Sequence, residues 1–248
     1  MTFKDHFSSH AGAYARHRPR YPVELFAYLA AIAPGRRLAW DCATGNGQAA
    51  LGLAEHFERV VATDASARQI GQAEAHPRIA YRVAPAERSG LESGSVELTT
   101  VAQALHWFDF DAFYAEVRRV SAPGARLAVW VYDLLRVAPA LDAVLRRYHD
   151  EVVGPYWPPE RKWVDERYAT IPFPFEEIAA PAFEMRAEWA LADLVGYLDT
   201  WSAAKRFKNE RGEDPLDLIR EELAAAWGGP EAVQAIRWPL VLRVGRVG

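Results

Sequence analysis

The stretch WDCATGNGQAA, residues 40–50, restricts the fold of this chain more than any other part of the sequence. It joins a short predicted strand, residues 37–40, to a predicted helix that ends near residue 57. Backbone N–H groups in such a turn, together with the N-terminus of the following helix, bind anionic groups in many α/β proteins. A strand, a glycine-rich turn and a helix in this order therefore predict a ligand site at the turn.

The same alternation continues as far as residue 132. We predict further strands at residues 59–63, 79–83, 95–102 and 126–132, helices at residues 22–32, 66–75 and 109–120, and a turn at 121–125. Strands separated by helices predict a mainly parallel sheet with helices on both faces and ligands at the carboxyl ends of the strands. The predicted fold class is therefore α/β, a Rossmann-like doubly wound sheet.

The second half of the chain has a different pattern of predicted elements. Helices are predicted at residues 138–153 and 191–227, around a segment rich in proline and aromatic residues, and strands at 183–189 and 236–247. With 248 residues, half of them apolar, the chain is long enough for one substantial core. We predict a single domain composed of an N-terminal flap, a cofactor-binding core, a helical lid in two pieces and a terminal strand pair: residues 1–21, 22–135, 136–182 with 190–228, and 183–189 with 236–247.

Composition argues against several classes of function. A formal net charge of -4 gives no general attraction to nucleic acid. No apolar segment approaches the length of a membrane span, and the start of the sequence lacks the apolar core of a signal peptide. Cys42 is the only cysteine, so neither disulfides nor a cysteine-rich metal site is expected. We predict a cytoplasmic protein that acts on a small molecule and holds no metal.

Two aspartates near the turn indicate which cofactor it would bind. The negative charge of Asp41, just before the turn, would oppose a pyrophosphate and favour a ligand with positive charge. S-adenosylmethionine fits, because its carboxylate can accept hydrogen bonds from the turn while its ammonium and sulfonium groups are cationic. Asp64, after the second strand, is suited to bind two ribose hydroxyls, as acids also do in dinucleotide-binding proteins. Either aspartate alone could instead be a turn former or a helix cap.

At this point the sequence resembles the class I S-adenosylmethionine-dependent methyltransferases. Residues 41–47, DCATGNG, match their first motif, D/E-x-G-x-G-x-G, with Ala43 at the first glycine. QALHWFD at residues 103–109, RHRPRYP near the start and LDTWSA near the end are similar to the methyltransferase type 11 subgroup, akin to trans-aconitate methyltransferases. The resemblance implies S-adenosylmethionine as the cofactor and a seven-stranded sheet whose last strand is antiparallel.

The resemblance also implies which residues bind the cofactor. Pro85 stands where the family has an acidic residue that meets adenine, so that contact passes to Ala86 or Glu87. The family's N-terminal segment closes over the cofactor, which makes Tyr14 and Arg18 candidates for a carboxylate of the cofactor or of an acidic substrate; a solvated basic surface is the alternative. The cofactor candidates are Tyr14, Arg18, Asp41, Ala43, Gly45, Gly47, Asp64, Ala86, Glu87 and Gln103.

Gln103, His106 and Trp107 are the candidate catalytic residues, because the residues after the fourth strand face the methyl group in this architecture. His106 could deprotonate a hydroxyl or amine, with an ordinary pKa that suits the task, whereas a carboxylate acceptor needs no base. Alternatively, His106 ties the loop to backbone carbonyls and Trp107 belongs to the core. The tryptophans of the helical segments would line an apolar lid or form a second small core: Trp157, Trp163 and Trp201.

We therefore predict an S-adenosylmethionine-dependent methyltransferase that acts on a small molecule, with a carboxylate-bearing acceptor as the leading hypothesis from the resemblance. One alternative is an NAD-dependent oxidoreductase built on the same glycine pattern. Another is a regulator that binds the cofactor without any chemistry of its own. Binding of NADH against S-adenosylhomocysteine distinguishes the first alternative, and methyl transfer to a panel of acceptors distinguishes the second.

Overall fold

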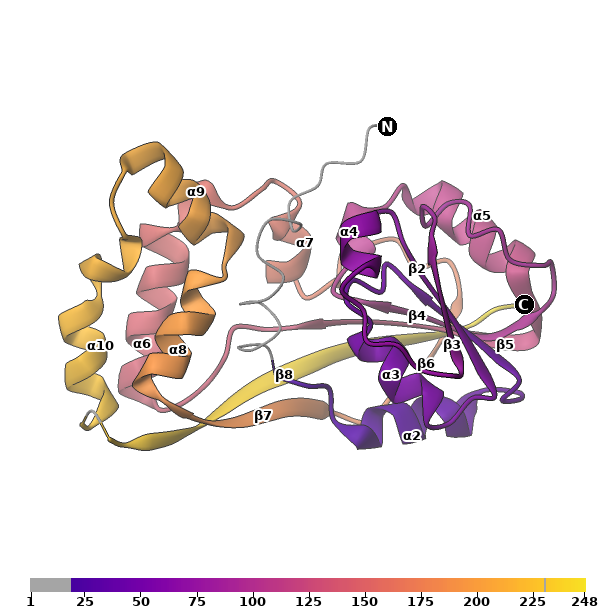
Figure 1. The fold of residues 1–248 in the computed structure, drawn as a ribbon, viewed down its shortest axis with the longest axis horizontal. Coiled ribbons are helices and arrows are strands. Elements are labelled where there is room, and N and C mark those ends of the chain that lie inside the picture. Colours follow the sequence, from indigo (N-terminus) through magenta and orange to yellow (C-terminus); the bar gives the residue numbers. More distant parts are fainter. Residues whose placement is uncertain (1–18, 230) are drawn as a thin grey trace.

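The computed structural model describes residues 19–229 and 231–248, and its centre is one sheet with the order β3-β2-β1-β4-β5-β8-β6, with β7 also paired to β8 (Figure 1). The strands are β1 Leu38–Cys42, β2 Arg59–Asp64, β3 Ile79–Val83, β4 Val96–Ala102, β5 Ser121–Tyr132, β6 Glu176–Ile178, β7 Phe183–Ala190 and β8 Val233–Arg246. Strands β1 to β5 pair in parallel. The predicted doubly wound α/β fold is confirmed.

The last strand, β8, is antiparallel to its neighbours, as predicted. One edge of β8 pairs with β5, and the other edge pairs first with β7 and then with β6, whose residues Glu176 and Ile178 lie opposite Arg246 and Val244. Strands β6 and β7 therefore occupy one edge position in succession. The sheet has eight strands in seven positions, because residues 179–182, which include Pro181, interrupt the edge strand.

Helices cover both faces of the sheet, and a separate group gathers at one end of the molecule. Helices α2 and α3 pack on one face and α5 on the other (Figure 1). Helices α6, α8, α9 and α10 lie beyond the sheet, joined to it by the long strands β7 and β8 (Figure 1). The bounds are α2 Val23–Ile32, α3 Gln48–Ala54, α4 Ala67–Ile70, α5 Phe110–Val120, α6 Pro139–Arg147, α7 Arg161–Asp165, α8 Leu191–Asp199, α9 Ser202–Arg211 and α10 Arg220–Trp227, with shorter helical turns η1 Leu105–Trp107, η2 Tyr148–Val152, η3 Gly154–Tyr156 and η4 Pro215–Leu218.

Several predicted elements differ from the structure in extent. The helix predicted at 66–75 is only the four residues of α4, because Gly71 follows it and His76 precedes a proline, which disfavours helical backbone there. The helix predicted at 191–227 is divided by Thr200, whose hydroxyl donates to the carbonyl of Tyr197, and by Gly212, which adopts a φ of +72° after α9. The turn predicted at 121–125 belongs to β5, where Ser121 already pairs with Val96.

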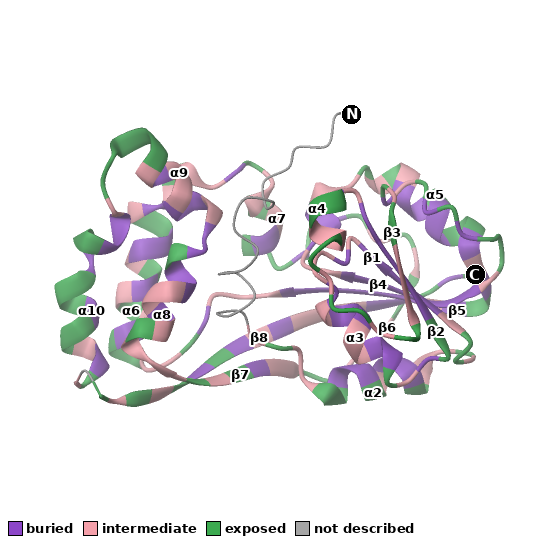
Figure 2. Cartoon of the chain, viewed as in Figure 1, coloured by how far each residue is buried: buried purple, intermediate pink, exposed green. Residues whose placement is uncertain are grey.

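Alternate residues of the central strands enter two apolar clusters on opposite faces of the sheet. On β5, Val129 faces the α5 side, whereas Trp130 faces the α2 and α3 side. The cluster that contains Trp130 continues without a break into helices α6, α8 and α10, so the helical group shares its core with one face of the sheet. Figure 2 shows the central strands and the inward sides of the helices as buried.

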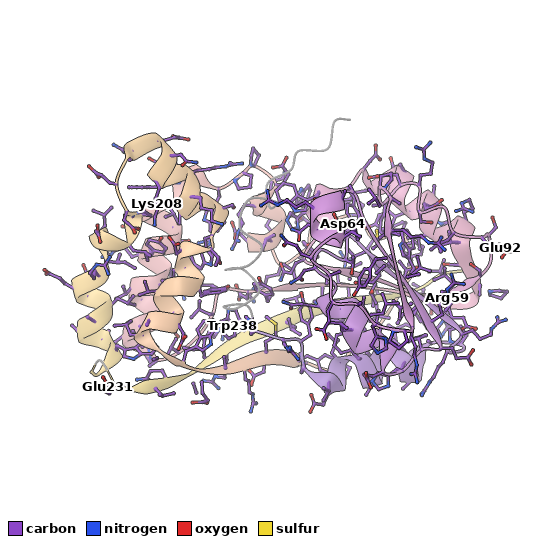
Figure 3. The ribbon with its side chains drawn as sticks, viewed as in Figure 1. Arg59, Asp64, Glu92, Lys208, Glu231 and Trp238 are labelled. Carbon is purple, nitrogen blue, oxygen red and sulfur yellow. The ribbon has the colours of Figure 1, made fainter. Side chains whose placement is uncertain are left out.

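This arrangement leaves the carboxyl ends of the parallel strands facing the helical group. Figure 3 shows Asp64 at that end of β2 and Arg59 at the opposite end. Helix α7 lies between the sheet and the helices α6, α8 and α9 (Figure 1) and packs against η1, which follows β4. Helix α7, which belongs to the segment predicted to form a lid, therefore lies at the end of the sheet where ligands bind in this architecture. Within the described part of the chain, we find no helix that is both long and apolar enough to span a membrane.

Candidate functional site

Asp41 lies beneath the glycine turn and is enclosed by it. It belongs to β1, is 1% exposed, and accepts hydrogen bonds from the hydroxyls of Thr44, at 2.5 Å, and Thr100, at 2.7 Å. Burial raises the pKa of Asp41 to about 6, although the two threonine hydroxyls act in the opposite direction. Ionised Asp41 is therefore costly to the folded protein, and this cost suggests that the charge serves a purpose at the site.

The turn itself adopts left-handed backbone at three of its positions. Ala43, Gly45 and Gly47 have φ values of +54°, +57° and +90°. A Cβ atom added at Gly45 would meet nothing within 4 Å, whereas one added at Gly47 would overlap the hydroxyl of Tyr81. The turn is thus closed by Tyr81 at its second glycine and open at its first, so a ligand can approach the backbone at Gly45.

Asp64 connects the turn to the next strand. Its carboxylate accepts hydrogen bonds from the backbone N–H groups of Gly45, at 2.9 Å, and Ser66, at 2.8 Å, one on each oxygen. The side chain is 8% exposed at the carboxyl end of β2. The two amides orient the Asp64 carboxylate, and each carboxylate oxygen can accept more than one hydrogen bond.

Ala86 and Glu87 lie after β3, next to the start of α5. Ala86 is buried, and a Glu87 carboxylate oxygen accepts a hydrogen bond from the backbone N–H of Asp109, the residue that caps α5, at 3.2 Å. The negative charge of Glu87 also contributes to raising the pKa of Cys42, which is buried in β1. The structure therefore brings Glu87 and the end of β1 into electrostatic contact.

Gln103, directly after β4, combines an unusual backbone with an unpaired side chain. Its φ is +59°, and its backbone N–H donates to the carbonyl of Trp130 at 2.9 Å. The side-chain Nε2 is enclosed and has no hydrogen-bond partner within the described residues. A strained backbone and an unsatisfied buried donor are both features that concentrate at binding sites.

His106 lies in η1 and is 9% exposed. Its Nδ1 is 2.7 Å from the hydroxyl oxygen of Tyr168, which comes from the segment after α7. Burial and the nearby charge of Arg161 lower the pKa of His106 to about 3, so the ring is neutral and a much weaker base than an ordinary imidazole. The ordinary pKa expected from the sequence does not hold here, because the shift depends on residues more than 50 positions away.

The tryptophan candidates pack against other aromatic side chains. Trp107 packs beside His106 with ring centroids 4.8 Å apart and is half-buried. Trp163 packs edge-on to Phe110 at the α5 face, whereas Trp157 and Trp201 pack together within the helical group, 5.6 Å apart. The second-core interpretation therefore describes Trp157 and Trp201 better than a lid lining does.

Two candidates, Tyr14 and Arg18, lie outside the described residues. The structure brings Asp41, the turn and Asp64 together at the ends of β1 and β2, with Gln103 and His106 after the neighbouring β4. Sequence reasoning missed Thr100, Tyr168 and Arg161. Thr100 could have been found from the pairing of β1 with β4, but nothing in the sequence connects Tyr168 to His106.

The residues present fit S-adenosylmethionine. The open space beside Gly45 admits a ligand to the turn, the charge of Asp41 suits a cation, and the Asp64 carboxylate is of the kind that accepts hydrogen bonds from ribose hydroxyls. A dinucleotide would place a pyrophosphate beside Asp41 and raise the electrostatic cost of that buried charge. Within the described residues, no three His, Cys, Asp or Glu side chains gather as a metal site would require.

Comparisons with known proteins agree with this geometry. Residues 40–129 match the family described as a methyltransferase domain. A Dictyostelium discoideum protein described as a candidate methyltransferase is 34% identical over 229 residues, or 91% of this chain and 87% of that protein. An uncharacterised methyltransferase of Mycobacterium tuberculosis is 33% identical over 230 residues, or 88% of this chain and 85% of its own length. The structure of a candidate type II methyltransferase from Anaeromyxobacter dehalogenans is similar with a TM-score of 0.88 at 50% identity, covering 93% of this chain and 98% of that one.

Proposed function

The chain belongs to the S-adenosylmethionine-dependent methyltransferases of the methyltransferase-domain family, and on this basis we propose that it methylates a small molecule that carries a carboxylate. The single observation that carries the acceptor proposal is the enclosed, unpaired Nε2 of Gln103 at the carboxyl end of β4. A buried N–H donor without a partner is stabilised most by an anionic acceptor atom, because hydrogen bonds to charged groups are stronger than those to neutral groups.

We assign the cofactor contacts on the same basis. Ala43, Gly45 and Gly47 would form the turn that lies against the methionine end of the cofactor, with open space beside Gly45, and Asp41 would stabilise the ammonium group. Asp64 would accept hydrogen bonds from the two ribose hydroxyls, and Ala86 with Glu87 would lie near adenine.

The reaction asks little acid–base chemistry of the protein. S-adenosylmethionine supplies a methyl carbon bonded to a sulfonium, which a carboxylate oxygen can attack directly as the carbon–sulfur bond breaks. A carboxylate is already ionised near neutral pH, so no proton has to be removed. Gln103, His106 and Trp107 would then act by holding the acceptor in line with the methyl group and by excluding water.

We expect the acceptor class to appear in a matched panel of small molecules. Each carboxylic acid is incubated with the protein and radiolabelled S-adenosylmethionine beside its primary amide, its alcohol and its amine. Label should enter the acids as base-labile methyl esters and should be absent from the three other series. Label in the amines or alcohols alone would contradict the carboxylate proposal, and label in no series together with tight cofactor binding would favour the regulator.

A further inference from the structure

A strained turn presents Tyr168 to His106. Arg167 and Tyr168 are consecutive residues other than glycine, and both have left-handed backbone, with φ values of +55° and +59°. Such backbone is strained for residues with a side chain and persists only where the surroundings impose it. Arg167 is tied to Asp133, just after β5, by a 2.6 Å ion pair, and Arg243 donates to the carbonyl of Tyr168 at 2.8 Å. The tethers come from two different strands, so the position of Tyr168 is strongly determined.

The surroundings of Tyr168 determine which group donates the hydrogen bond between Tyr168 and His106. Tyr168 is fully buried, and Nδ1 of His106 is the one hydrogen-bond acceptor that its side chain meets among the described residues. A buried O–H is rarely left without an acceptor. If Nδ1 carried the proton, the phenol would receive that hydrogen bond and have nowhere to donate its own. The phenol must therefore donate to Nδ1, which places the proton of the neutral imidazole on Nε2.

The electrostatic surroundings agree with this direction. Burial raises the pKa of Tyr168 far above that of an ordinary tyrosine, so its proton is retained and can be donated to His106. Burial, and then the positive charge of Arg161, lower the pKa of His106 and keep the ring neutral.

We propose that Tyr168 is a positioning residue that holds His106 with its proton on Nε2, so that His106 donates a hydrogen bond to an anionic methyl acceptor and does not act as a base. Within the described residues, the hydrogen bond of the His106 ring is at Nδ1, which leaves Nε2 to donate to a ligand. Gln103, whose buried Nε2 has no partner within the described residues, lies three residues earlier, so both N–H donors follow β4. The proposal deepens the proposed function and rests on it for the identity of the acceptor.

Arg161 adds a preference for negative charge. Its guanidinium is held by Asp165, at 2.8 Å, and stacks over the ring of Trp157, 4.3 Å from its centroid. From that position its charge acts on His106. The Arg161 cation, although partly balanced by Asp165, and the neutral N–H donors of Gln103 and His106 favour an acceptor that arrives ionised, such as a carboxylate, over an alcohol or amine that must lose a proton.

The test compares Tyr168→Phe with Tyr114→Phe. Tyr114 is a matched control, because it is also buried and its hydroxyl also bonds the segment after α7, donating to the carbonyl of Pro172 at 2.6 Å, but its hydroxyl has no bond to His106. Protein labelled with ¹⁵N-histidine is examined by NMR with S-adenosylhomocysteine bound, and His106→Gln identifies the signal of His106. Cofactor affinity is measured calorimetrically on the same samples.

We expect His106 of the unchanged protein and of Tyr114→Phe to be the neutral Nε2–H tautomer from pH 5.5 to pH 8.5. In Tyr168→Phe the proton should divide between Nδ1 and Nε2, and methyl transfer to a carboxylate of the panel should fall by about twofold or more in kcat/KM with unchanged cofactor affinity, because only the Nε2–H fraction can donate to the acceptor. An Nδ1–H tautomer in the unchanged protein, or a tautomer unaffected by Tyr168→Phe, overturns the proposal. Absence of cofactor binding instead contradicts the proposed function while leaving the tautomer result readable.

Discussion

Replacing Asp41 by Asn should raise the free energy of unfolding above pH 7 by about 3 kcal/mol, because burial shifts the pKa of this carboxyl from 3.8 to about 6 and each pKa unit corresponds to about 1.4 kcal/mol. A buried acid with a raised pKa binds its proton more tightly in the folded state than in the unfolded state. Its contribution to stability is therefore most favourable below about pH 4 and is lost as the pH rises to about 6. Asparagine removes this loss, and the hydroxyls of Thr44 and Thr100 can reorient to pair with the amide.

The measurement is urea unfolding of both proteins without cofactor from about pH 4 to pH 8. The difference between them should be small at the acid end, should grow between pH 4 and pH 6 and should then stay constant. Asp111→Asn, an exposed acid in the first turn of α5, is the control and should show no such rise. An Asp41→Asn variant that is less stable than the unchanged protein at every pH would contradict the view that ionised Asp41 destabilises the folded state.

The same substitution should weaken S-adenosylmethionine binding at pH 7.5 by at least about tenfold, since a buried charge near the ammonium group is lost. The variant would thus be more stable but bind the cofactor more weakly. This combination is expected where a binding residue lowers the stability of the folded protein. Affinity equal to that of the unchanged protein would mean that Asp41 only shapes the turn.

Replacing Asp64 by Ala should lower the affinity for S-adenosylhomocysteine by about 1–3 kcal/mol, which is roughly fivefold to 150-fold. The carboxylate is expected to accept two ribose hydroxyls, and it also orients the N–H groups of Gly45 and Ser66. Both the direct contacts and the shape of the turn would be lost. Calorimetric titration measures the affinity, and circular dichroism shows whether the variant is folded.

Ser66→Ala is the matched control for this variant. The Ser66 hydroxyl caps α4 by accepting a hydrogen bond from Gln69, at 3.3 Å, and its removal disturbs the same loop without removing the carboxylate. Affinity should change much less in Ser66→Ala than in Asp64→Ala. Equal losses in the two variants would mean that Asp64 acts through the loop and not through the ribose.

Most of the fold could be predicted from local sequence patterns, because the central strands are short, apolar and separated by recognisable turns. The glycine turn and the alternation of strands and helices were predicted from such patterns, whereas the antiparallel last strand was predicted from the family resemblance. The short strand β6 has none, because its three residues pair only with the far end of β8. The division of residues 191–227 into separate helices depends on one threonine hydroxyl and one glycine, which a helical pattern does not detect.

The parts of the candidate site that lie close in sequence to the strand ends could be placed together from the sequence. Asp41, Gly45 and Asp64 lie together, as expected, because β1 and β2 pair in parallel and end beside each other. The partner of His106 was not found, because Tyr168 reaches it from 62 positions further along the chain through a strained turn. Burial and the distant Arg161 lower the pKa of His106, and the local sequence shows neither, so the ordinary pKa expected from the sequence differs from the lowered one in the structure.

The cofactor assignment depends on one claim: the acidic glycine turn selects a cationic sulfonium cofactor over a dinucleotide. Calorimetric titration of the unchanged protein with S-adenosylmethionine and, separately, with NADH under the same conditions tests it most directly. We expect saturable binding of one S-adenosylmethionine per chain and no measurable binding of NADH at the same concentrations. Binding of NADH as tight as or tighter than that of S-adenosylmethionine would contradict the claim.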